Sequence, residues 1–283
     1  MTAPIIRTLE DLRALTAGWR LSGEAVGVVP TMGALHAGHL SLVEAAKSAC
    51  DRVIVTIFVN PRQFNRLEDL KNYPRTEQED AVKLAPFAVD VVYVPDPNQV
   101  YPDGFSTNVS LTGVTDVMEG PNRPGHFDGV ATVVAKLFLQ TGADKAFFGE
   151  KDYQQLMVVR HMARDLDIPV EVVGCPTVRE PSGLAMSSRN LRLSEQGLLK
   201  AAVLFPTLQE AAAALSAGAG YESTIRQAQD RLIQSGFEKV EYLELHSAAS
   251  LAALTRPSEP ARLFAAAWVE GIRLIDNIPV ARI

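Results

Sequence analysis

The sequence predicts an α/β protein, with a parallel sheet covered by helices on both faces and a smaller C-terminal α+β domain. In the first two thirds, fully apolar segments of strand length alternate with helical segments, which indicates a doubly covered parallel sheet. The 283 residues are 47% hydrophobic and 21% charged, so the chain can bury a large globular core. The composition shifts after about Val178, and we place the domain division between residues 178 and 179.

The predicted strands and helices follow one another from the N-terminus. The β-branched run at Val26, Val28 and Val29 predicts a buried strand that ends at Pro30. Further strands are predicted at Val53–Val59, Val89–Val94, Lys145–Phe148 and Val170–Val173. Helices are predicted at Leu9–Trp19, Leu40–Cys50, Glu77–Ala85, Val130–Gln140 and Gln154–Leu166. Parallel sheets bind ligands beyond the carboxyl ends of their strands, so we expect a site in the loops there.

The C-terminal domain is predicted to combine two helices with a few alternating strands. An Ala-rich helix at Leu198–Ala214 is followed by a second helix at Tyr221–Gln234. Lys239–Leu245 alternates with a period of two, as a half-buried strand does. Glu270-Gly271 separates the strands Ala261–Val269 and Ile272–Ile275, which predicts a β-hairpin.

Charge, cysteine content and hydropathy exclude several classes of protein. The formal net charge of −6 leaves no broad basic surface for nucleic acid, so a polyanion site must be local. Cys50 and Cys175 lie in or beside apolar segments, which favours buried thiols over a disulfide. The N-terminus has no signal-peptide pattern, and no apolar run approaches the length of a membrane span. We therefore expect a cytoplasmic protein that binds neither a membrane nor nucleic acid.

Two histidines stand where the first predicted strand leads into a helix. His36 and His39 form a His-Ala-Gly-His sequence after the glycine turn at Gly33. A helix N-terminus favours an anion, glycine lets a phosphate approach the backbone, and imidazoles donate hydrogen bonds to phosphate oxygens. The pattern therefore indicates nucleotide chemistry at the α-phosphate. Two alternatives remain open: the histidines cap the helix, or they bind a metal, although the zinc-protease pattern requires His-Glu-x-x-His.

Polar residues also stand at the ends of other predicted elements. Asn60 and Gln63 follow a buried strand, where their amides either bind an oxygen-rich substrate or cap the loop. Lys151 follows another strand and can neutralise a triphosphate, while Asp152 can orient that lysine or bind a metal. Tyr73–Thr76 precedes an acidic helix start at Glu77, Glu79 and Asp80, where the acids complement the helix dipole or, less favoured, hold Mg²⁺ through water.

Two further loops carry polar side chains. In Asn122–Gly129, Arg123 and His126 are candidates to face a carboxylate or phosphate, and Asp128 is a candidate helix cap. The glycine-hinged loop Gly183–Asn190 either closes over phosphates or is a serine-rich linker.

Taken in order, these stretches resemble the pantothenate synthetase family, the pantoate–β-alanine ligases of the His-x-Gly-His nucleotidyltransferase superfamily. The resemblance covers nearly the whole chain, and it implies a Rossmann-like nucleotide-binding domain. It also implies a reaction in two halves, in which ATP adenylates (R)-pantoate and the amine of β-alanine then displaces AMP. The matching stretches are Val29–His39, Ile57–Phe64, Tyr73–Thr76, Arg123–Phe127, Phe148–Leu156, Leu184–Asn190 and, more weakly, Arg273–Asn277.

The resemblance implies a role for individual residues. The catalytic residues would be His39, His36, Lys151 and Arg189. ATP would contact Met32, Gly33, Ala34, Leu35, His36, Ala37, Gly38, His39, Gly149, Glu150, Lys151, Asp152, Val178, Met186, Ser187, Ser188 and Arg189. Pantoate would be bound by Gln63 and Gln155, with Asn60 and Tyr73 lining the site. Mg²⁺ would accompany ATP, with Glu79, Asp80 and Asp152 as candidate ligands, and a homodimer is implied.

Two other functions compete with this interpretation. A nucleotidyltransferase acting on a phosphate acceptor would form a stable nucleotidyl product and would need no amine. A nucleotide-binding module without turnover would bind ATP and release no pyrophosphate. The chain departs from the usual family pattern at Ser182 and Ile272, and it has a shorter segment after Asn190.

Overall fold

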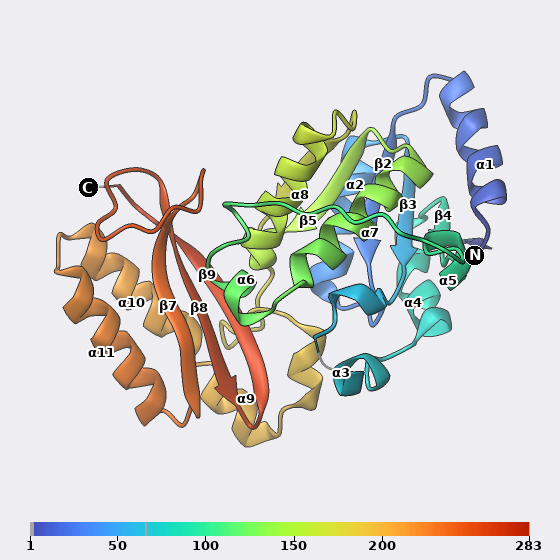
Figure 1. Ribbon diagram of the computed structural model, residues 1–283. Coiled ribbons are helices and arrows are strands. Elements are labelled where there is room, and N and C mark those ends of the chain that lie inside the picture. The colour runs from blue at the N-terminus through green and yellow to red at the C-terminus, as the bar shows by residue number, and fades with distance from the viewer. Residues whose placement is uncertain (1–2, 66, 283) are drawn as a thin grey trace. The chain divides into compact units, whose positions relative to one another are not determined.

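The computed structural model describes residues 3–65 and 67–282, which divide into two compact units (Figure 1). Unit 1 consists of Met1–Glu150 and Gln154–Pro176, and unit 2 consists of Lys151–Tyr153 and Thr177–Ile283. The boundary between Pro176 and Thr177 thus lies within two residues of the boundary that we place after Val178. The short segment Lys151–Tyr153 belongs to unit 2, although it lies between elements of unit 1 in the sequence.

The described part of unit 1 contains a six-stranded parallel sheet, which confirms the predicted fold class. Its strand order is β1-β4-β3-β2-β5-β6, so the order reverses direction at β2, with β3 on one side and β5 on the other. In such sheets a ligand binds at this reversal, beyond the carboxyl ends of the strands. The strands are β1 (Ile5–Ile6), β2 (Val26–Thr31), β3 (Arg52–Ile57), β4 (Val91–Tyr93), β5 (Lys145–Gly149) and β6 (Glu171–Cys175).

Helices cover both faces of this sheet. Phe147 belongs to the apolar cluster that includes Val43 and Ala46 of α2. Its neighbour Phe148 points to the opposite face, because side chains alternate along a strand, and it meets Phe138 of α7 at 6.2 Å between ring centroids. The helices are α1 (Leu9–Leu21), α2 (Ala37–Ala49), α3 (Leu67–Lys71), α4 (Glu77–Leu84), α5 (Pro97–Val100), α6 (Glu119–Asn122), α7 (His126–Thr141) and α8 (Tyr153–Asp165), with short 3₁₀ turns η1 (Pro61–Gln63), η2 (Ala85–Phe87) and η3 (Glu150–Asp152).

Pro30 does not end its strand, contrary to the sequence prediction. The β2–β3 pairing continues through Pro30 to Thr31, whose carbonyl accepts the N–H of Phe58 at 3.0 Å. Since the hydrogen-bonding direction alternates along a strand, the position of Pro30 faces the β5 side. The pairing with β5 ends at Val28, so no partner there requires the N–H group that proline lacks.

Two helices also begin earlier than the sequence predicts. α2 starts at Ala37 with His36 as its N-cap, so His39 lies inside the first turn instead of in the preceding loop. α7 starts at His126 with Gly125 as its N-cap. Asp128 is therefore a helical residue and not the cap, and its carboxylate accepts a hydrogen bond from Ser110 at 2.8 Å. A histidine or a glycine is a weaker sequence signal for a helix start than Ser, Thr, Asp or Asn.

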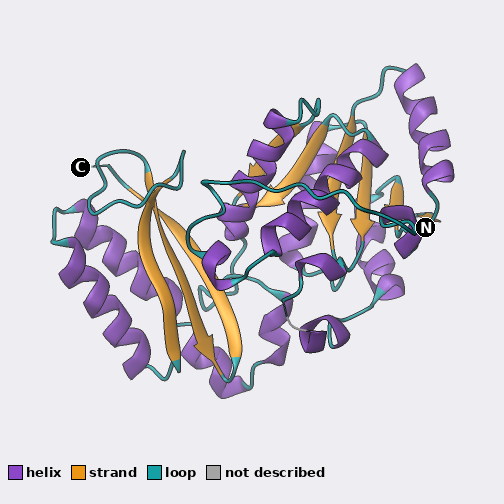
Figure 2. Cartoon of the chain, viewed as in Figure 1, coloured by secondary structure: helices purple, strands orange, loops and turns teal. Residues whose placement is uncertain are grey.

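Unit 2 contains an antiparallel sheet in the order β7-β8-β9, with α10 and α11 side by side along one face (Figure 2). Its core includes Leu204, Leu208, Leu232, Leu263 and Leu274. The predicted hairpin is confirmed, since Glu270 and Gly271 have φ values of 51° and 68°, as a type I′ turn requires. The elements are η4 (Ser188–Arg192), α9 (Glu195–Ala201), α10 (Leu204–Ser216), α11 (Tyr221–Gln234), β7 (Lys239–Ser247), β8 (Ala261–Val269) and β9 (Ile272–Val280).

The single long helix predicted at Leu198–Ala214 is wrong, because the segment forms α9 and α10 with a break between Ala201 and Leu204. The segment Glu195–Ser216 is the one stretch of the described chain that is long and apolar enough to cross a membrane by length and composition. The sequence prediction had found no such run. Core helices pass the same test, and Leu204, Leu208 and Leu215 of α10 are buried in the core of unit 2.

Candidate active site

The loop that joins β2 to α2 is held in an unusual backbone conformation. Gly33 and Ala34 have φ values of 85° and 52°, so two consecutive residues lie in the left-handed region. The hydroxyl of Thr31 donates to the carbonyl of Thr56 at 2.7 Å and accepts the N–H of Gly33 at 3.1 Å. The end of β2 therefore fixes the start of the loop that carries the predicted ATP contacts.

Asp80 of α4 holds the rest of this loop. Its fully buried carboxylate accepts the N–H groups of Ala34 and Leu35, each at 2.8 Å, and the hydroxyl of Thr76 at 3.0 Å. Lys83 lies 3.6 Å from the same carboxylate and donates to the carbonyl of Leu35 at 2.9 Å. The structure thus gives Asp80 a role as a loop anchor, which differs from both the complement of the helix dipole and the metal ligand that the sequence suggests.

His36 and His39 are oriented by backbone groups at the start of α2. Nδ1 of His36 accepts the N–H of Gly38 at 3.1 Å, and Nδ1 of His39 accepts the N–H of His36 at 3.4 Å. A neutral imidazole that accepts at Nδ1 carries its proton on Nε2. The two rings, 4.1 Å apart between centroids, are therefore donors at Nε2, at a helix end that favours an anion. The capping alternative and the phosphate-binding role are compatible, because they use different nitrogens.

A hydrogen bond from Asn60 orients the side-chain amide of Gln63. Oδ1 of Asn60 accepts the hydroxyl of Tyr101 at 2.8 Å and the N–H of Arg62 at 3.2 Å. Its Nδ2 consequently faces Oε1 of Gln63 at 2.9 Å and the carbonyl of Gly129 at 3.0 Å. Asn60 is only 1% exposed and caps η1 through the N–H of Arg62, which confirms the predicted cap, while its second contact supports Gln63.

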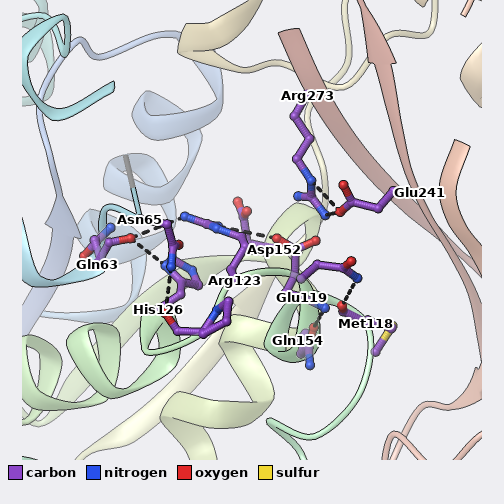
Figure 3. A network of polar contacts seen from close by, with 12 residues as sticks. Gln63, Asn65, Met118, Glu119, Arg123, His126, Asp152, Gln154, Glu241 and Arg273 are labelled. Carbon is purple, nitrogen blue, oxygen red and sulfur yellow. Dashed lines mark hydrogen bonds and ion pairs between the residues drawn. The ribbon is translucent and has the colours of Figure 1, made fainter. Parts of the chain in front are cut away.

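Gln63 connects the substrate residues with the nucleotide loop. Its Nε2 lies 3.0 Å from Sδ of Met32, a residue predicted to contact ATP. Its carbonyl accepts Nδ1–H of His126 at 2.9 Å and the guanidinium of Arg123 at 3.4 Å (Figure 3). Arg123 also meets the carboxylate of Glu119 at 3.4 Å. The loop residues Arg123 and His126 thus fix the backbone of Gln63, a residue predicted to bind the substrate.

The two neighbouring glutamines of α8 have different surroundings. Gln154 is buried, accepts the N–H of Glu119 at 3.0 Å, and donates to the carbonyls of Val114 and Val117. Gln155 is half-buried, and within residues 3–65 and 67–282 its side chain has no hydrogen-bond partner. Gln155 therefore keeps its amide available for a ligand. Tyr73 packs edge-on against Phe64, at 5.6 Å between ring centroids.

Unit 2 contains the remaining predicted nucleotide residues. Lys151 lies in η3, two residues after the last residue of β5, and its side chain is 16% exposed. Its ammonium lies 3.7 Å from the carboxylate of Asp152, and its carbonyl accepts Nδ2–H of Asn277 at 2.9 Å. Gly149 and Glu150 directly precede Lys151 in the chain and belong to unit 1, and Gly149 is the last residue of β5.

The segment from Val178 to Asn190 is a braced loop. Met186 donates its N–H to the carbonyl of Val178 at 3.0 Å, which links two predicted nucleotide residues. The hydroxyl of Ser187 accepts the N–H of Arg189 at 3.2 Å and so caps η4, which includes Ser188. Asn190 is buried and donates to the carbonyl of Ala185 at 3.1 Å.

A family model described as pantoate-beta-alanine ligase matches residues 4–279 of the chain. The chain belongs to this ligase family. It is 67% identical to the pantothenate synthetase of Ruegeria sp. (strain TM1040) over 280 residues, covering 99% of this chain and 100% of that protein. It is 66% identical to the pantothenate synthetase of Ruegeria pomeroyi, covering 100% and 99% of the two chains.

Solved structures of the ligase family have the same fold. The pantothenate synthetase of Thermus thermophilus superposes with a TM-score of 0.90 at 43% identity, covering 97% of this chain and 98% of that chain. The pantoate-beta-alanine ligase of Francisella tularensis, complexed with beta-gamma ATP and beta-alanine, superposes with a TM-score of 0.83 at 35% identity, covering 98% and 97%.

Several residues that organise the site escape the sequence argument for this ligase. An acidic residue is common at a helix N-terminus, so the position of Asp80 in the sequence gives no sign of its hydrogen bonds to the distant residues Ala34 and Leu35. Tyr101 stands far from Asn60 in the sequence, and no local pattern joins them. Asp276 and Asn277 lie in the weak match at Arg273–Asn277, which was the one available signal for them.

Proposed function

We propose that the protein condenses (R)-pantoate with β-alanine to pantothenate and cleaves ATP to AMP and pyrophosphate. The observation that carries this proposal is the full-length match to pantoate–β-alanine ligases in a chain whose β2–α2 loop presents two histidine donors at the reversal of the strand order. The pantothenate synthetases named above share 66–67% of their residues with this chain over its whole length. The ligase of Francisella tularensis supports ATP and β-alanine as ligands.

In the first half-reaction, a carboxylate oxygen of pantoate attacks the α-phosphorus of ATP. The bond from that phosphorus to the bridging oxygen breaks, and pyrophosphate leaves with the electron pair, so pantoyl adenylate forms. Negative charge grows on the phosphate oxygens during this displacement. Nε2–H of His36 and of His39 is proposed to donate to those oxygens, and the ammonium of Lys151 and the guanidinium of Arg189 to neutralise them.

In the second half-reaction, the neutral amine of β-alanine attacks the acyl carbon of the adenylate. The carbon–oxygen bond to the phosphate breaks, AMP leaves with the electron pair, and the new ammonium loses one proton to give the amide. AMP is a far better leaving group than the oxide of a free carboxylate, which is why activation must come first. Holding the reacting atoms together supplies much of the rate enhancement.

Pantoate is proposed to bind to the amides of Gln63 and Gln155. Because Asn60 donates to Oε1 of Gln63, the Nε2 group of Gln63 presents its hydrogens toward Met32 and the nucleotide loop. Donors there suit a carboxylate that has to approach a phosphate. Tyr73 is proposed to line the same site from its position against Phe64.

ATP is proposed to bind to the residues implied by the family resemblance. In unit 1 they are Met32, Gly33, Ala34, Leu35, His36, Ala37, Gly38, His39, Gly149 and Glu150; in unit 2 they are Lys151, Asp152, Val178, Met186, Ser187, Ser188 and Arg189. We propose the domain bounds 1–178 and 179–283.

The side chains that the structure describes do not build a protein-held metal centre. Among them, no group of three or more His, Cys, Asp or Glu residues could hold an ion. Glu79 is exposed, and the carboxylate of Asp80 is occupied by two backbone N–H groups and a hydroxyl. Mg²⁺ belongs to the proposal only as the counter-ion that ATP brings with it.

The protein is also proposed to be a cytoplasmic homodimer that binds neither membrane nor nucleic acid. The net charge of −6 supports the absence of nucleic-acid binding. Sedimentation at micromolar concentration should give twice the chain mass of 30.7 kDa. A mass of 30.7 kDa would overturn the dimer.

The decisive experiment follows the nucleotide products from ATP and Mg²⁺ with pantoate alone, with β-alanine alone and with both. We expect AMP and pyrophosphate in amounts that equal pantothenate, and under turnover only when both substrates are present. ADP and phosphate would indicate an acyl phosphate and overturn the adenylate route. A stable nucleotidyl product without amine dependence would instead support a nucleotidyltransferase.

A further inference from the structure

We propose that Asp276 and Asn277, adjacent on β9, are positioning residues that hold the two nucleotide-binding segments of unit 2. This inference rests on the proposed function, which gives Lys151 and the loop Ser187–Arg189 their role toward ATP phosphates. Successive residues of a strand point to opposite faces of a sheet. One strand therefore anchors one segment from each face.

Asp276 points to the face of the sheet that carries the core of unit 2. Its strand neighbours Leu274 and Ile278 belong to that core, as does Ala265, which pairs with Asp276 in β8. Asp276 is 2% exposed and binds the guanidinium of Arg179 with two hydrogen bonds, of 2.6 and 2.9 Å.

Arg179 transmits this anchor to the loop that ends at Arg189. It donates to the carbonyl of Gly183 at 3.1 Å and stacks on Phe205 of α10, at 3.8 Å from the ring centroid. Its backbone also bridges to Ala185. The hinge glycine, with a φ of 89°, is thereby fixed just before Met186, Ser187 and Arg189.

Asn277 points to the opposite face and holds Lys151. Its Nδ2 donates to the carbonyl of Lys151 at 2.9 Å, and its Oδ1 accepts from Arg262 at 2.6 Å. Arg262 in turn stacks on Tyr153, with 4.2 Å to the ring centroid, so the short segment Lys151–Tyr153 is held at both ends. Asn277 is 2% exposed.

Stability alone is a weak explanation for these buried polar groups. Replacing a buried ion pair by well-packed apolar residues is often neutral or stabilising, so burial of such a pair is weak evidence for a role in stability. The same sheet contains a second shielded pair, Arg273 and Glu241, which meet at 2.6 Å. Within the described chain, the side chain of Glu241 accepts hydrogen bonds from Trp268 and Arg273 and from neither nucleotide-binding segment, so this pair provides a matched control.

The central test uses Asn277→Asp, which keeps an oxygen for Arg262 and replaces the donor to the Lys151 carbonyl by a second carboxylate oxygen. We expect the kcat/KM for ATP to fall at least tenfold, and the pantoate-dependent exchange of pyrophosphate into ATP to fall equally, because catalytic geometry tolerates little displacement. The KM for pantoate should stay near that of the wild type, whereas the melting temperature should fall, because an oxygen now faces the carbonyl of Lys151. An unchanged kcat/KM for ATP would overturn the proposal.

A second variant, Arg179→Lys, tests the other face. It keeps a positive charge beside Asp276 but loses the two-pronged contact and the bond to Gly183. We expect weaker binding of ATP, measured by calorimetry with its β,γ-methylene analogue, with unchanged binding of pantoate. Glu241→Gln should lower the melting temperature and leave both constants unchanged. Equal losses of ATP and pantoate binding in Arg179→Lys would show a merely structural role.

A double-mutant cycle tests whether Asn277 acts through Lys151. If it does, adding Asn277→Asp to Lys151→Ala should cause little further loss of exchange activity, because the lysine is already absent. A full tenfold further loss would overturn this route. A wild-type enzyme without pantoate-dependent exchange would refute the proposed function itself, whereas an active wild type with unaffected variants refutes only the positioning roles.

Discussion

The carboxylate of Asp80 accepts the backbone N–H of Ala34 at 2.8 Å across 46 positions of the sequence. A second oxygen of the same carboxylate accepts the N–H of Leu35 at the same distance. Ala34 has a φ of 52°, a conformation that costs a residue with a Cβ atom about 1 kcal/mol or more. The buried carboxylate therefore stabilises a strained turn directly before His36, and helix α4 determines where the histidines lie.

Asp80→Asn should impair both stability and catalysis. The new Nδ2 would face an N–H donor, so at least one hydrogen bond is lost and the free energy of unfolding should fall by about 1–3 kcal/mol. We expect kcat/KM for ATP to fall at least tenfold, since the loop before His36 shifts. Steady-state kinetics and denaturant unfolding measure the two effects.

Glu79, the exposed neighbour of Asp80, provides the control for this prediction. Glu79→Gln should leave stability and kinetics near those of the wild type. Excess Mg²⁺ should not restore Asp80→Asn, because the lost groups are hydrogen-bond acceptors of the loop. Restoration by Mg²⁺ would revive the role of Asp80 as a metal ligand.

Tyr101→Phe should weaken pantoate binding. Burial raises the pKa of Tyr101 to about 12, so its hydroxyl remains a donor to Asn60 at any assay pH. Without this hydroxyl, the side chain of Asn60 is less firmly oriented, and the side chain of Gln63 is therefore less firmly oriented too. The free energy of unfolding should fall by about 1 kcal/mol, and the KM for pantoate should rise severalfold.

Tyr93→Phe is the matched control for Tyr101→Phe. Burial also raises the pKa of Tyr93 to about 12, and its hydroxyl donates to Gln140 at 3.1 Å. The variant should lose a similar amount of stability with an unchanged KM for pantoate. A similar rise in KM for both variants would show that the effect of Tyr101 is not specific to Asn60.

The fold was largely predictable because its signals are local. The limits of α11 at Tyr221–Gln234 and of β8 at Ala261–Val269 agree with the sequence prediction, since helical periodicity and β alternation are strong there. The two-residue β1 was missed because Ile5–Ile6 is too short to show a pattern. α9 and α10 were merged because both are apolar, although Pro206 signals the break: it has no N–H to donate to the carbonyl of Ala202 and is tolerated only in the first turn of a helix.

The site was predictable only at the level of its motifs. The spacing of His36 and His39 and the position of Lys151 after a strand both follow from chain order. The support of these residues does not, because it comes from distant positions: Asp80 holds the β2–α2 loop, and Asn277 holds Lys151. Sequence distance hides such contacts until the fold brings the elements together.

Asp90 should contribute a pH-dependent part of the stability. Burial raises its pKa, but the N–H of Val53 and the side chains of Arg52 and Lys47 outweigh burial and hold the pKa below its ordinary value. A carboxyl group whose pKa is lowered on folding stabilises the folded state at pH values above its pKa in the unfolded chain. This stabilisation is lost as the pH falls through the pKa of the folded state. The contribution should therefore be complete at pH 5–7 and decline below about pH 4.

Asp90→Asn tests this contribution. At neutral pH the variant should unfold at a lower temperature than the wild type, because its free energy of unfolding should be lower by about 1–3 kcal/mol. The difference should narrow as the pH falls below about 4, because the wild-type carboxyl then becomes neutral too. Glu259→Gln, at an exposed position of unit 2, should show no such difference. A difference that stays constant to pH 3 would mean that shape, not charge, accounts for the role of Asp90.

The histidines of the site should occupy opposite tautomers, which NMR can resolve. Nδ1 of His36 and of His39 accepts a backbone N–H, so each neutral ring must carry its proton on Nε2. Nδ1 of His126 faces the carbonyl of Gln63 at 2.9 Å, so there the proton must lie on Nδ1. Long-range ¹H–¹⁵N spectra of ¹⁵N-histidine protein, assigned with single His→Asn variants of the five histidines, should show these patterns at a pH where the rings are neutral. ATP should then perturb Nε2 of His36 and His39 more than either nitrogen of His126, because under the proposed function only the first two rings donate to phosphate. An Nδ1 proton on His36 or His39 would contradict the backbone bonds that orient them, and with these the proposed way in which the loop stabilises charge.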